Sequence, residues 1–232
     1  MPAYRWGDIE QEVIDPGFSD VRGAVVRGRE IAVSRIVYPA GAEVGLHALP
    51  KEQIQTVIRG TARFRVAGEE RIVGPAEAVL IRPHAPFALQ VLEEFEVLRF
   101  GDVGAGDGRP EARSGAGQPF FRWAELTADF ITPKRSSARG TTITGERIEV
   151  ALMHFTAGTE AKPHSHPNEQ IQVPLRGKIR GLAGTEVVSG PGEVILIPAL
   201  IQHWAAVLED YEAVNGKNIV PGWSVYNARW EK

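Results

Sequence analysis

Short apolar runs separated by turn residues dominate the hydrophobic pattern of this chain. Residues 31–38 read IAVSRIVY, a run of β-branched and aromatic side chains that ends at Pro39, Ala40 and Gly41. Such residues fit the half-buried surface of a sheet, and the Pro and Gly after them mark a turn. Turn signals recur about every ten residues along the chain, and a helical period of apolar residues is almost absent. The pattern predicts an all-β fold.

The chain repeats itself at a constant offset. The stretch from Gly41 to Gly60 (GAEVGLHALPKEQIQTVIRG) matches the stretch from Gly158 to Gly177 (GTEAKPHSHPNEQIQVPLRG) without a gap, 117 positions later (164 − 47 = 177 − 60 = 117). Farther on, GPAE at 74–77 corresponds to GPGE at 190–193 after a one-residue deletion. A repeat of this length is too long for a solenoid unit and predicts two similar β units in tandem.

We expect the two units at residues 1–110 and 111–232. Between them, residues 101–118 (GDVGAGDGRPEARSGAGQ) are rich in Gly and polar residues, as in a flexible connection. The segment that follows, 120–130 (FFRWAELTADF), fits either a short helix or an extended lead-in strand. The period of its apolar residues does not separate these two interpretations.

Two histidines of the second copy form a candidate chelating pair. His164 and His166 stand two apart, and residues two apart on an extended strand project from the same face. Gln170 follows four residues later, and Gly177 supplies the backbone freedom for a turn into the next strand. Imidazole nitrogens held in this way are common metal ligands in proteins.

This spacing resembles the first motif of the cupin superfamily: Gly, five residues, His-x-His, three residues, a Glu or Gln ligand position, six residues, Gly. The second motif of the superfamily supplies one more histidine. Here it corresponds to Gly192, Pro198 and His203, with Leu200 where the motif usually has Gly and Val207 where it usually has Asn.

The resemblance implies two tandem cupin barrels, each a double-stranded β-helix or jelly roll. The layout is similar to that of small bicupins, among them the bicupin isomerase of bacilysin biosynthesis. It also implies a metal and a substrate inside the barrel mouth, and a homodimer. The implied ligands are four uncharged side chains: His164, His166, Gln170 and His203.

One divalent transition metal ion is the expected cofactor. Fe, Mn, Co, Ni and Zn all fit a mixed imidazole and amide set. Because uncharged ligands leave the ion with its full charge of +2, an anionic oxygen ligand, such as the carboxylate of a 2-oxo acid or an enolate, is favoured at an open position.

The first copy retains only part of this set. His47 and Gln53 match His164 and Gln170, whereas Leu49 and Phe87 take the places of His166 and His203. Two neutral ligands make a poor site for a divalent ion, so we expect a degenerate, metal-free first site. His84 is an alternative ligand there, shifted by three residues from the position of Phe87.

Four further residues are candidates for binding the substrate. Gln172 shares the strand face of Gln170 and is expected to line the pocket. Arg180, His154 and Tyr226 could orient a carboxylate or shuttle a proton, although their spacing fixes none of them on the inner face. By the same alternation Glu169 faces away from the pocket, as a solvated or interface carboxylate. No acid or base residue can be assigned from the sequence.

Composition narrows the class of partner. The 26 basic and 29 acidic residues give a net charge of −3, which offers no electrostatic footprint for nucleic acid or an anionic membrane. The chain has no Cys, which excludes disulfides and thiolate ligands. Its start resembles no secretory signal, and no apolar run approaches the roughly 20 residues of a membrane helix. We therefore expect a cytoplasmic protein that acts on a small molecule.

The sequence thus favours a metal-dependent enzyme for a small, oxygen-rich organic acid. The metal would act as a Lewis acid in an isomerisation, cyclisation or decarboxylation. An Fe(II)-dependent dioxygenase is one alternative, and a small-molecule-binding or sensor cupin without turnover is another. The complete ligand set in the second copy disfavours a storage protein.

Overall fold

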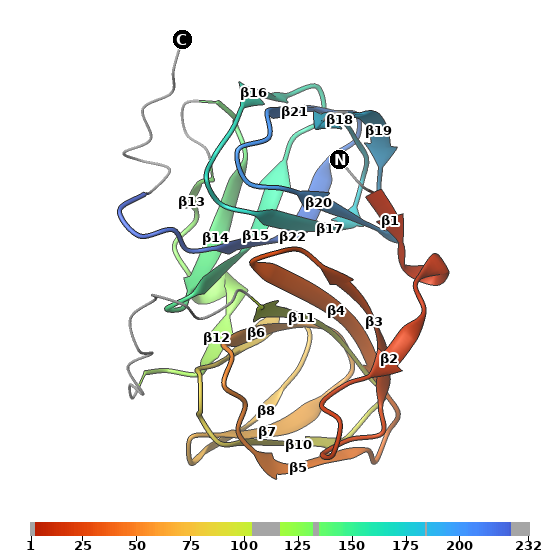
Figure 1. Cartoon of the computed structure of the whole chain (residues 1–232), viewed down its shortest axis with the longest axis vertical. Coiled ribbons are helices and arrows are strands. Elements are labelled where there is room, and N and C mark those ends of the chain that lie inside the picture. Colours follow the sequence, from red (N-terminus) through yellow and green to blue (C-terminus); the bar gives the residue numbers. More distant parts are fainter. Residues whose placement is uncertain (1–2, 104–116, 132–134, 184, 224–232) are drawn as a thin grey trace. The chain divides into compact units, whose positions relative to one another are not determined.

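The computed structural model describes residues 3–103, 117–131, 135–183 and 185–223 (Figure 1). In these residues the chain is almost entirely β, with four antiparallel sheets, two of seven strands and two of four. The expected all-β fold is confirmed. None of the described helices is long and apolar enough to span a membrane.

Contacts within the chain separate two compact units, which we call the N-terminal and C-terminal barrels. The N-terminal barrel comprises Ile9–Leu126 and Ile143–Ile148, and the C-terminal barrel comprises Met1–Asp8, Thr127–Thr142 and Glu149–Lys232. The predicted boundary between residues 110 and 111 lies outside the described residues.

The N-terminal barrel consists of two facing sheets. The larger has the order β12-β9-β6-β11-β4-β3-β2 and the smaller the order β5-β10-β7-β8 (Figure 1). Its elements are β2 (Gln11–Val13), β3 (Arg22–Arg27), β4 (Ile31–Tyr38), β5 (Glu43–His47), β6 (Gln53–Arg59), β7 (Ala62–Val66), β8 (Glu69–Val73), β9 (Glu77–Ile81), β10 (Phe87–Val91), β11 (Phe95–Asp102), β12 (Phe120–Arg122) and the 3-10 turn η2 (Trp123–Glu125).

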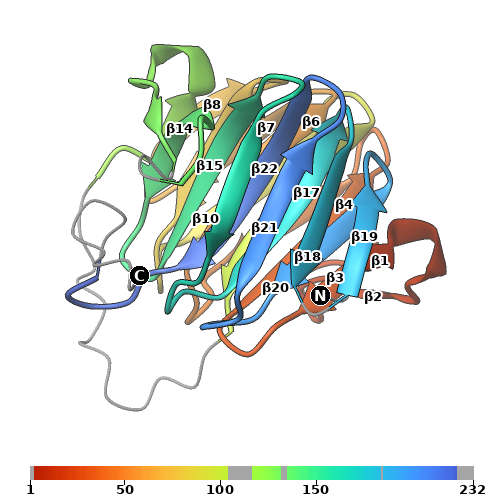
Figure 2. The same cartoon turned by 90° about the horizontal axis from the view of Figure 1, so that it is seen from above.

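The C-terminal barrel repeats this plan. Its larger sheet has the order β1-β20-β17-β22-β15-β14-β13, and its smaller sheet, β16-β21-β18-β19, lies across it (Figure 2). Its elements are β1 (Ala3–Arg5), the 3-10 turn η1 (Trp6–Asp8), β13 (Asp129–Phe130), β14 (Arg139–Thr144), β15 (Ile148–Phe155), β16 (Glu160–His164), β17 (Gln170–Arg176), β18 (Ile179–Ala183), β19 (Thr185–Ser189), β20 (Glu193–Ile197), β21 (His203–Val207) and β22 (Tyr211–Asn218).

Two short strands belong to a different unit from the one predicted. β1 pairs with β20 of the C-terminal barrel, and β12 pairs with β9 of the N-terminal barrel. Each ends at the Arg of an Arg-Trp pair, at 5–6 and at 122–123, and each Trp is buried. The predicted division at residue 110 is therefore corrected at both segments. Each strand hydrogen-bonds to an edge strand of the other predicted unit. Residues 120–130 contain two short strands, β12 and β13, and one 3-10 turn, so each of the two interpretations of this segment was partly right.

Turn glycines and strand alternation shape each barrel. Gly60 and Gly177 have φ of +76° and +70°, and a Cβ on either would lie within 2.2 Å of a backbone oxygen, so only Gly fits. Along the strands, alternate side chains enter the barrel. Tyr38 and Phe95 lie in the core of the N-terminal barrel, and Met153 and Tyr211 in that of the C-terminal barrel.

Glu52 illustrates how a buried carboxylate can serve the fold. The side chain is 0% exposed and accepts hydrogen bonds from the backbone N–H groups of Glu146, Arg147 and Ile148. These bonds satisfy the charge inside the N-terminal unit. Glu169 holds the equivalent position in the second copy and is 3% exposed, so of the two expected roles, solvated or interface carboxylate, the solvated one was wrong.

Candidate metal centre

Three strands of the C-terminal barrel and one connection present the predicted ligands. His164 ends β16 and pairs with His203, which begins β21. Gln170 begins β17, and His166 lies in the connection between β16 and β17. The His-x-His spacing and the pairing of β16 with β21 therefore bring residues 39 positions apart (203 − 164 = 39) into one cluster.

The three imidazoles converge. One ring nitrogen from each of His164, His166 and His203 lies within 4.8 Å of the other two, and all three residues are buried. In the described part of the chain, this is the only such group of three or more His, Cys, Asp or Glu residues. Gln170 joins them, with its Oε1 3.2 Å from His166 Nε2.

Backbone carbonyls fix the tautomer of all three imidazoles in the cluster. Nδ1 of His164 lies 2.6 Å from Lys162 O, Nδ1 of His166 lies 2.9 Å from Asn168 O, and Nδ1 of His203 lies 2.9 Å from Ile201 O. A carbonyl oxygen can only accept, so each Nδ1 carries the hydrogen and each Nε2 carries a lone pair. Orientation of this kind is what metal-binding histidines need from their surroundings.

The contact between Gln170 and His166 also fits a cation. Oε1 of Gln170 and Nε2 of His166 are both acceptors, so no hydrogen bond joins them at 3.2 Å. A proton on Nε2 would relieve the repulsion, but burial, followed by the electrostatic effect of Lys217, lowers the pKa of His166 from 6.5 to about 2. A positive ion between the two atoms would satisfy both in this orientation, so the residues present fit a divalent metal.

The other two imidazoles are also held neutral. Burial and then the nearby His203 lower the pKa of His164 from 6.5 to about 4, and burial lowers the pKa of His203. Neutral imidazole is the form that binds metals, so the site is ready for an ion across the physiological pH range.

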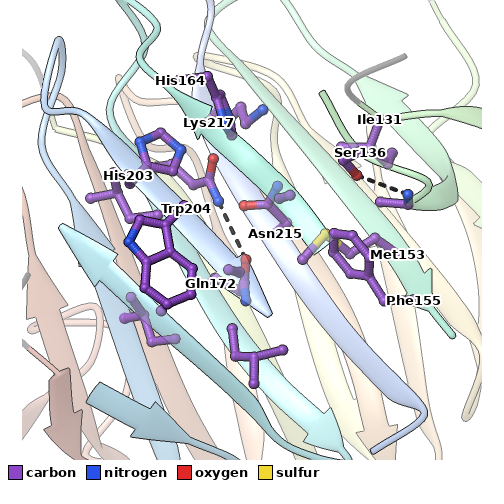
Figure 3. Close-up of a pocket in the computed structure, with 18 residues that line it drawn as sticks. Ile131, Ser136, Met153, Phe155, His164, Gln172, His203, Trp204, Asn215 and Lys217 are labelled. Atoms are coloured by element: carbon purple, nitrogen blue, oxygen red, sulfur yellow. Dashed lines mark hydrogen bonds between the residues drawn. The ribbon is translucent and has the colours of Figure 1, made fainter. Parts of the chain in front are cut away.

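The cluster opens into a small pocket inside the C-terminal barrel. The pocket has a volume of about 60 Å³, and its lining includes His164, Gln170 and His203. Figure 3 shows His164, His203 and Lys217 at one end, with the apolar side chains of Met153 and Phe155 to the side. A small ligand there would contact polar groups at one end and hydrocarbon along its flank.

Lys217 brings an amino group into this pocket. Its Cα is paired with that of Gln170 across β17 and β22, and it is 5% exposed. Among the described residues no salt bridge joins it to an acid, and burial lowers its pKa against the weaker opposing effect of Glu149. An ammonium in such a place is costly without an anion beside it.

A polar group without a partner lies in the same pocket. Oδ1 of Asn215 is buried and accepts no hydrogen bond within the described structure. Trp204 from β21 also lines the pocket, and the ring of Trp223 lies 6.1 Å from that of His166.

Of the four predicted substrate-binding residues, the structure places one at the pocket and two outside it. Gln172 lines the pocket, as expected. Arg180 and His154 do not: Arg180 is exposed near Glu186 at 3.7 Å, and His154 is exposed 3.1 Å from Glu212. Tyr226 lies outside the described residues.

Strand alternation explains both corrections. Met153 and Phe155 point into the pocket from β15, so His154 between them points out. Ile179 and Gly181 line the pocket from β18, so Arg180 between them also points out.

The first-copy residues are arranged differently. His47 also donates from Nδ1 to a carbonyl, that of Gly45, but its ring stacks on Phe18 and lies tilted against Phe87, with the ring centroids 4.2 Å apart in both pairs. Gln53 lines a separate cavity of about 360 Å³ in the N-terminal barrel. His84 is exposed in a turn, so it does not replace the missing ligand.

The same turn explains the departure of Leu200 from the cupin motif. Leu200 and its counterpart His84 have φ of +65° and +61°. Only Gly adopts this region without strain, which accounts for the usual Gly at this position. The chain therefore keeps the turn despite the substitution.

Sequence reasoning missed Lys217 and Asn215. Both lie on the inner face of β22, where alternate residues from Tyr211 to Lys217 point into the barrel. In the alignment of β22 with β11, Gly101 is the counterpart of Lys217 and Arg99 that of Asn215. Strand alternation applied to this alignment would have placed both residues on the inner face.

Comparisons with known proteins support the fold. Neither protein-family models nor curated proteins match the sequence. Many solved structures do. Oxalate decarboxylase of Bacillus subtilis, a protein with Mn(II) centers, is similar over 94% of this chain and 76% of its own, with 17% identity and a TM-score of 0.68. AerE from Microcystis aeruginosa is similar over 90% of this chain and 97% of its own, with 14% identity and a TM-score of 0.72.

A third similar structure is Ylba from E. coli, which covers 94% of this chain and 90% of its own, with 12% identity and a TM-score of 0.73. Identities at this level establish the fold and leave the reaction open. The two motifs, the paired jelly-roll sheets and these likenesses agree: the chain has the fold of the cupin superfamily.

Proposed function

We propose that the chain is a metal-dependent enzyme that acts on a small, oxygen-rich organic acid, in a reaction of isomerase, cyclase or decarboxylase type. The observation that carries the proposal is the convergence of three neutral imidazoles and one amide oxygen at a pocket that also contains the amino group of Lys217. Neutral ligands and a lysine together favour an anionic ligand.

A divalent transition metal ion bound by His164, His166, Gln170 and His203 would supply Lewis-acid stabilisation of negative charge that develops on a substrate oxygen. Manganese is a candidate, because Mn(II) is found in the similar oxalate decarboxylase. The same protein supports a small carboxylic acid as the substrate class.

The residues of the chain itself bind and orient the acid. The ammonium of Lys217 attracts a substrate carboxylate, and Oδ1 of Asn215 accepts a hydrogen bond from a hydroxyl or amine of the substrate. Met153 and Phe155 cover the apolar flank and exclude water, which strengthens the charge interactions at the other end.

Lys217→Met tests the proposal. The Mn(II)-loaded protein is titrated by calorimetry with a panel of 2-oxo acids and small dicarboxylates that includes oxalate, and turnover is followed by NMR. Loss of the ammonium should weaken acid binding about 10- to 100-fold, since hydrogen bonds to charged groups contribute about 1.5–3 kcal/mol. Lys178→Met, an exposed lysine paired with Glu209, is the matched control and should bind like wild type.

Two results would contradict the proposal. One is that no acid of the panel binds better with Mn(II) than without it. The other is that Lys217→Met binds the acids as tightly as wild type does. Oxygen consumption measured in the same samples separates this chemistry from that of a dioxygenase.

A further inference from the structure

A chain of buried hydrogen bonds leads from the candidate metal centre to a tyrosine. Nε2 of Gln170 donates to Oε1 of Gln172 at 3.3 Å, and Nε2 of Gln172 donates to the hydroxyl of Tyr211 at 2.7 Å. All three residues are buried, Tyr211 at 0% exposure. Burial also raises the pKa of Tyr211, so the hydroxyl stays neutral.

The direction of this chain decides which end of Gln170 meets the metal site. A carboxamide has one accepting and one donating end. Because Gln170 donates from Nε2 to Gln172, its Oε1 points at Nε2 of His166, 3.2 Å away. If both amides turned over, Gln170 would donate to that imidazole lone pair and occupy it in place of an ion.

The N-terminal barrel holds the same two amides in the opposite order. There Nε2 of Gln55, the counterpart of Gln172, donates to Oε1 of Gln53 at 3.2 Å. Oε1 of Gln55 is buried without a hydrogen-bond partner among the described residues. The counterpart of Tyr211 is Phe95, which has no hydroxyl to bind this amide.

We propose that Tyr211, through Gln172, is a positioning residue that holds the carbonyl oxygen of Gln170 toward the metal. By accepting a hydrogen bond from Nε2 of Gln172, the hydroxyl satisfies that amide while its Oε1 accepts from Gln170, which stabilises the metal-binding orientation of Gln170. The inference rests on the proposed metal site and extends it by two residues beyond the ligands. Partners of ligands are expected to contribute in this way to metal affinity.

Tyr211→Phe, which copies Phe95, tests the inference. Mn(II) is titrated into metal-free protein, and bound Mn(II) is followed by EPR, which reports affinity and ligand environment independently of turnover. We expect affinity to fall about 10- to 100-fold, the usual effect of removing a partner of a metal ligand, together with a changed EPR spectrum. Tyr38→Phe removes a hydroxyl from a residue 2% exposed in the other barrel and should leave both readouts unchanged.

A second substitution separates positioning from a general loss of stability. A carboxylate at 172 can only accept, so in Gln172→Glu the amide of Gln170 must donate to it and keep Oε1 toward the metal. In that background, Tyr211→Phe should change Mn(II) affinity by less than about threefold, a clear departure from additivity.

The outcomes are distinct. Equal Mn(II) affinity and spectra for wild type and Tyr211→Phe would overturn the inference while leaving the metal site standing. An equal loss in both backgrounds would also overturn it, because the hydroxyl would then act independently of Gln170. A wild type that binds no Mn(II) would contradict the metal site and the inference together.

Discussion

The two barrels share a backbone plan and differ in what fills it. At equivalent inward positions, large apolar side chains of the N-terminal barrel are replaced by small or metal-binding ones in the C-terminal barrel. The N-terminal set is Val44, Leu49, Phe64, Phe87 and Leu89, and the corresponding C-terminal set is Ala161, His166, Gly181, His203 and Ala205.

This difference shows how one fold can serve for packing or for binding. In the N-terminal barrel, Phe64 is 0% exposed and Phe87 packs on His47, so this part of the interior is a core. In the C-terminal barrel, Gly181 and Ala205 leave the pocket open beside the imidazoles. The backbone tolerates both because the inward positions come from strand alternation, which the substitutions leave unchanged.

The largest effect is expected from filling the pocket. Ala205→Leu copies Leu89 and adds three carbon atoms to a pocket of about 60 Å³. We expect acid binding to fall below detection while Mn(II) binding persists, because the ligands are untouched. Calorimetry with the acid panel and EPR of bound Mn(II) measure the two effects separately.

Ala206→Leu is the control, since it adds the same atoms at a neighbouring residue that does not line the pocket. Undiminished acid binding by Ala205→Leu would mean that the acid binds elsewhere. The comparison of the two interiors would then have no bearing on function.

A smaller effect concerns the metal-free protein and pH. Burial lowers the pKa of His164 from 6.5 to about 4 and that of His166 to about 2. Below pH 6.5 these two imidazoles take up protons in the unfolded chain but not yet in the folded one. The free energy of unfolding that they contribute above pH 6.5 is therefore lost as the pH falls through their folded-state pKa values. The shift of His164 alone corresponds to about 3 kcal/mol.

Urea unfolding at pH 7.5, 6 and 5 measures this loss. The free energy of unfolding should decrease steadily toward pH 5 in metal-free wild type, and less steeply in His164→Gln. A free energy that is the same at pH 7.5 and pH 5 would show that the imidazoles are not buried as described.

Much of the fold followed from local pattern. The alternation of residues 31–38 and the repeat at 41–60 and 158–177 were sufficient to predict two β units, and the His-x-His pair predicted the face that carries the imidazoles. The pairing of β1 with the C-terminal barrel and of β12 with the N-terminal barrel could not be predicted, because a three-residue strand carries no information about which edge it joins.

The site was predictable where spacing fixed the face and unpredictable elsewhere. Gln172 was assigned from its register with Gln170. Arg180 and His154 were chosen for their chemistry without a register, and the structure places both outside the pocket. Lys217 was missed because the strand YEAVNGKN looks solvated, and only closure of the barrel buries its ammonium.

Metal content tests the central claim most directly. Wild type, His166→Leu, which copies Leu49, and His154→Leu, which removes an exposed histidine, are purified side by side and analysed for transition metals. Wild type and His154→Leu should each carry about one ion per chain, and His166→Leu much less, because two imidazoles and one weakly donating amide oxygen hold a divalent ion less tightly than the full set of four. Equal metal content in wild type and His166→Leu would contradict the account.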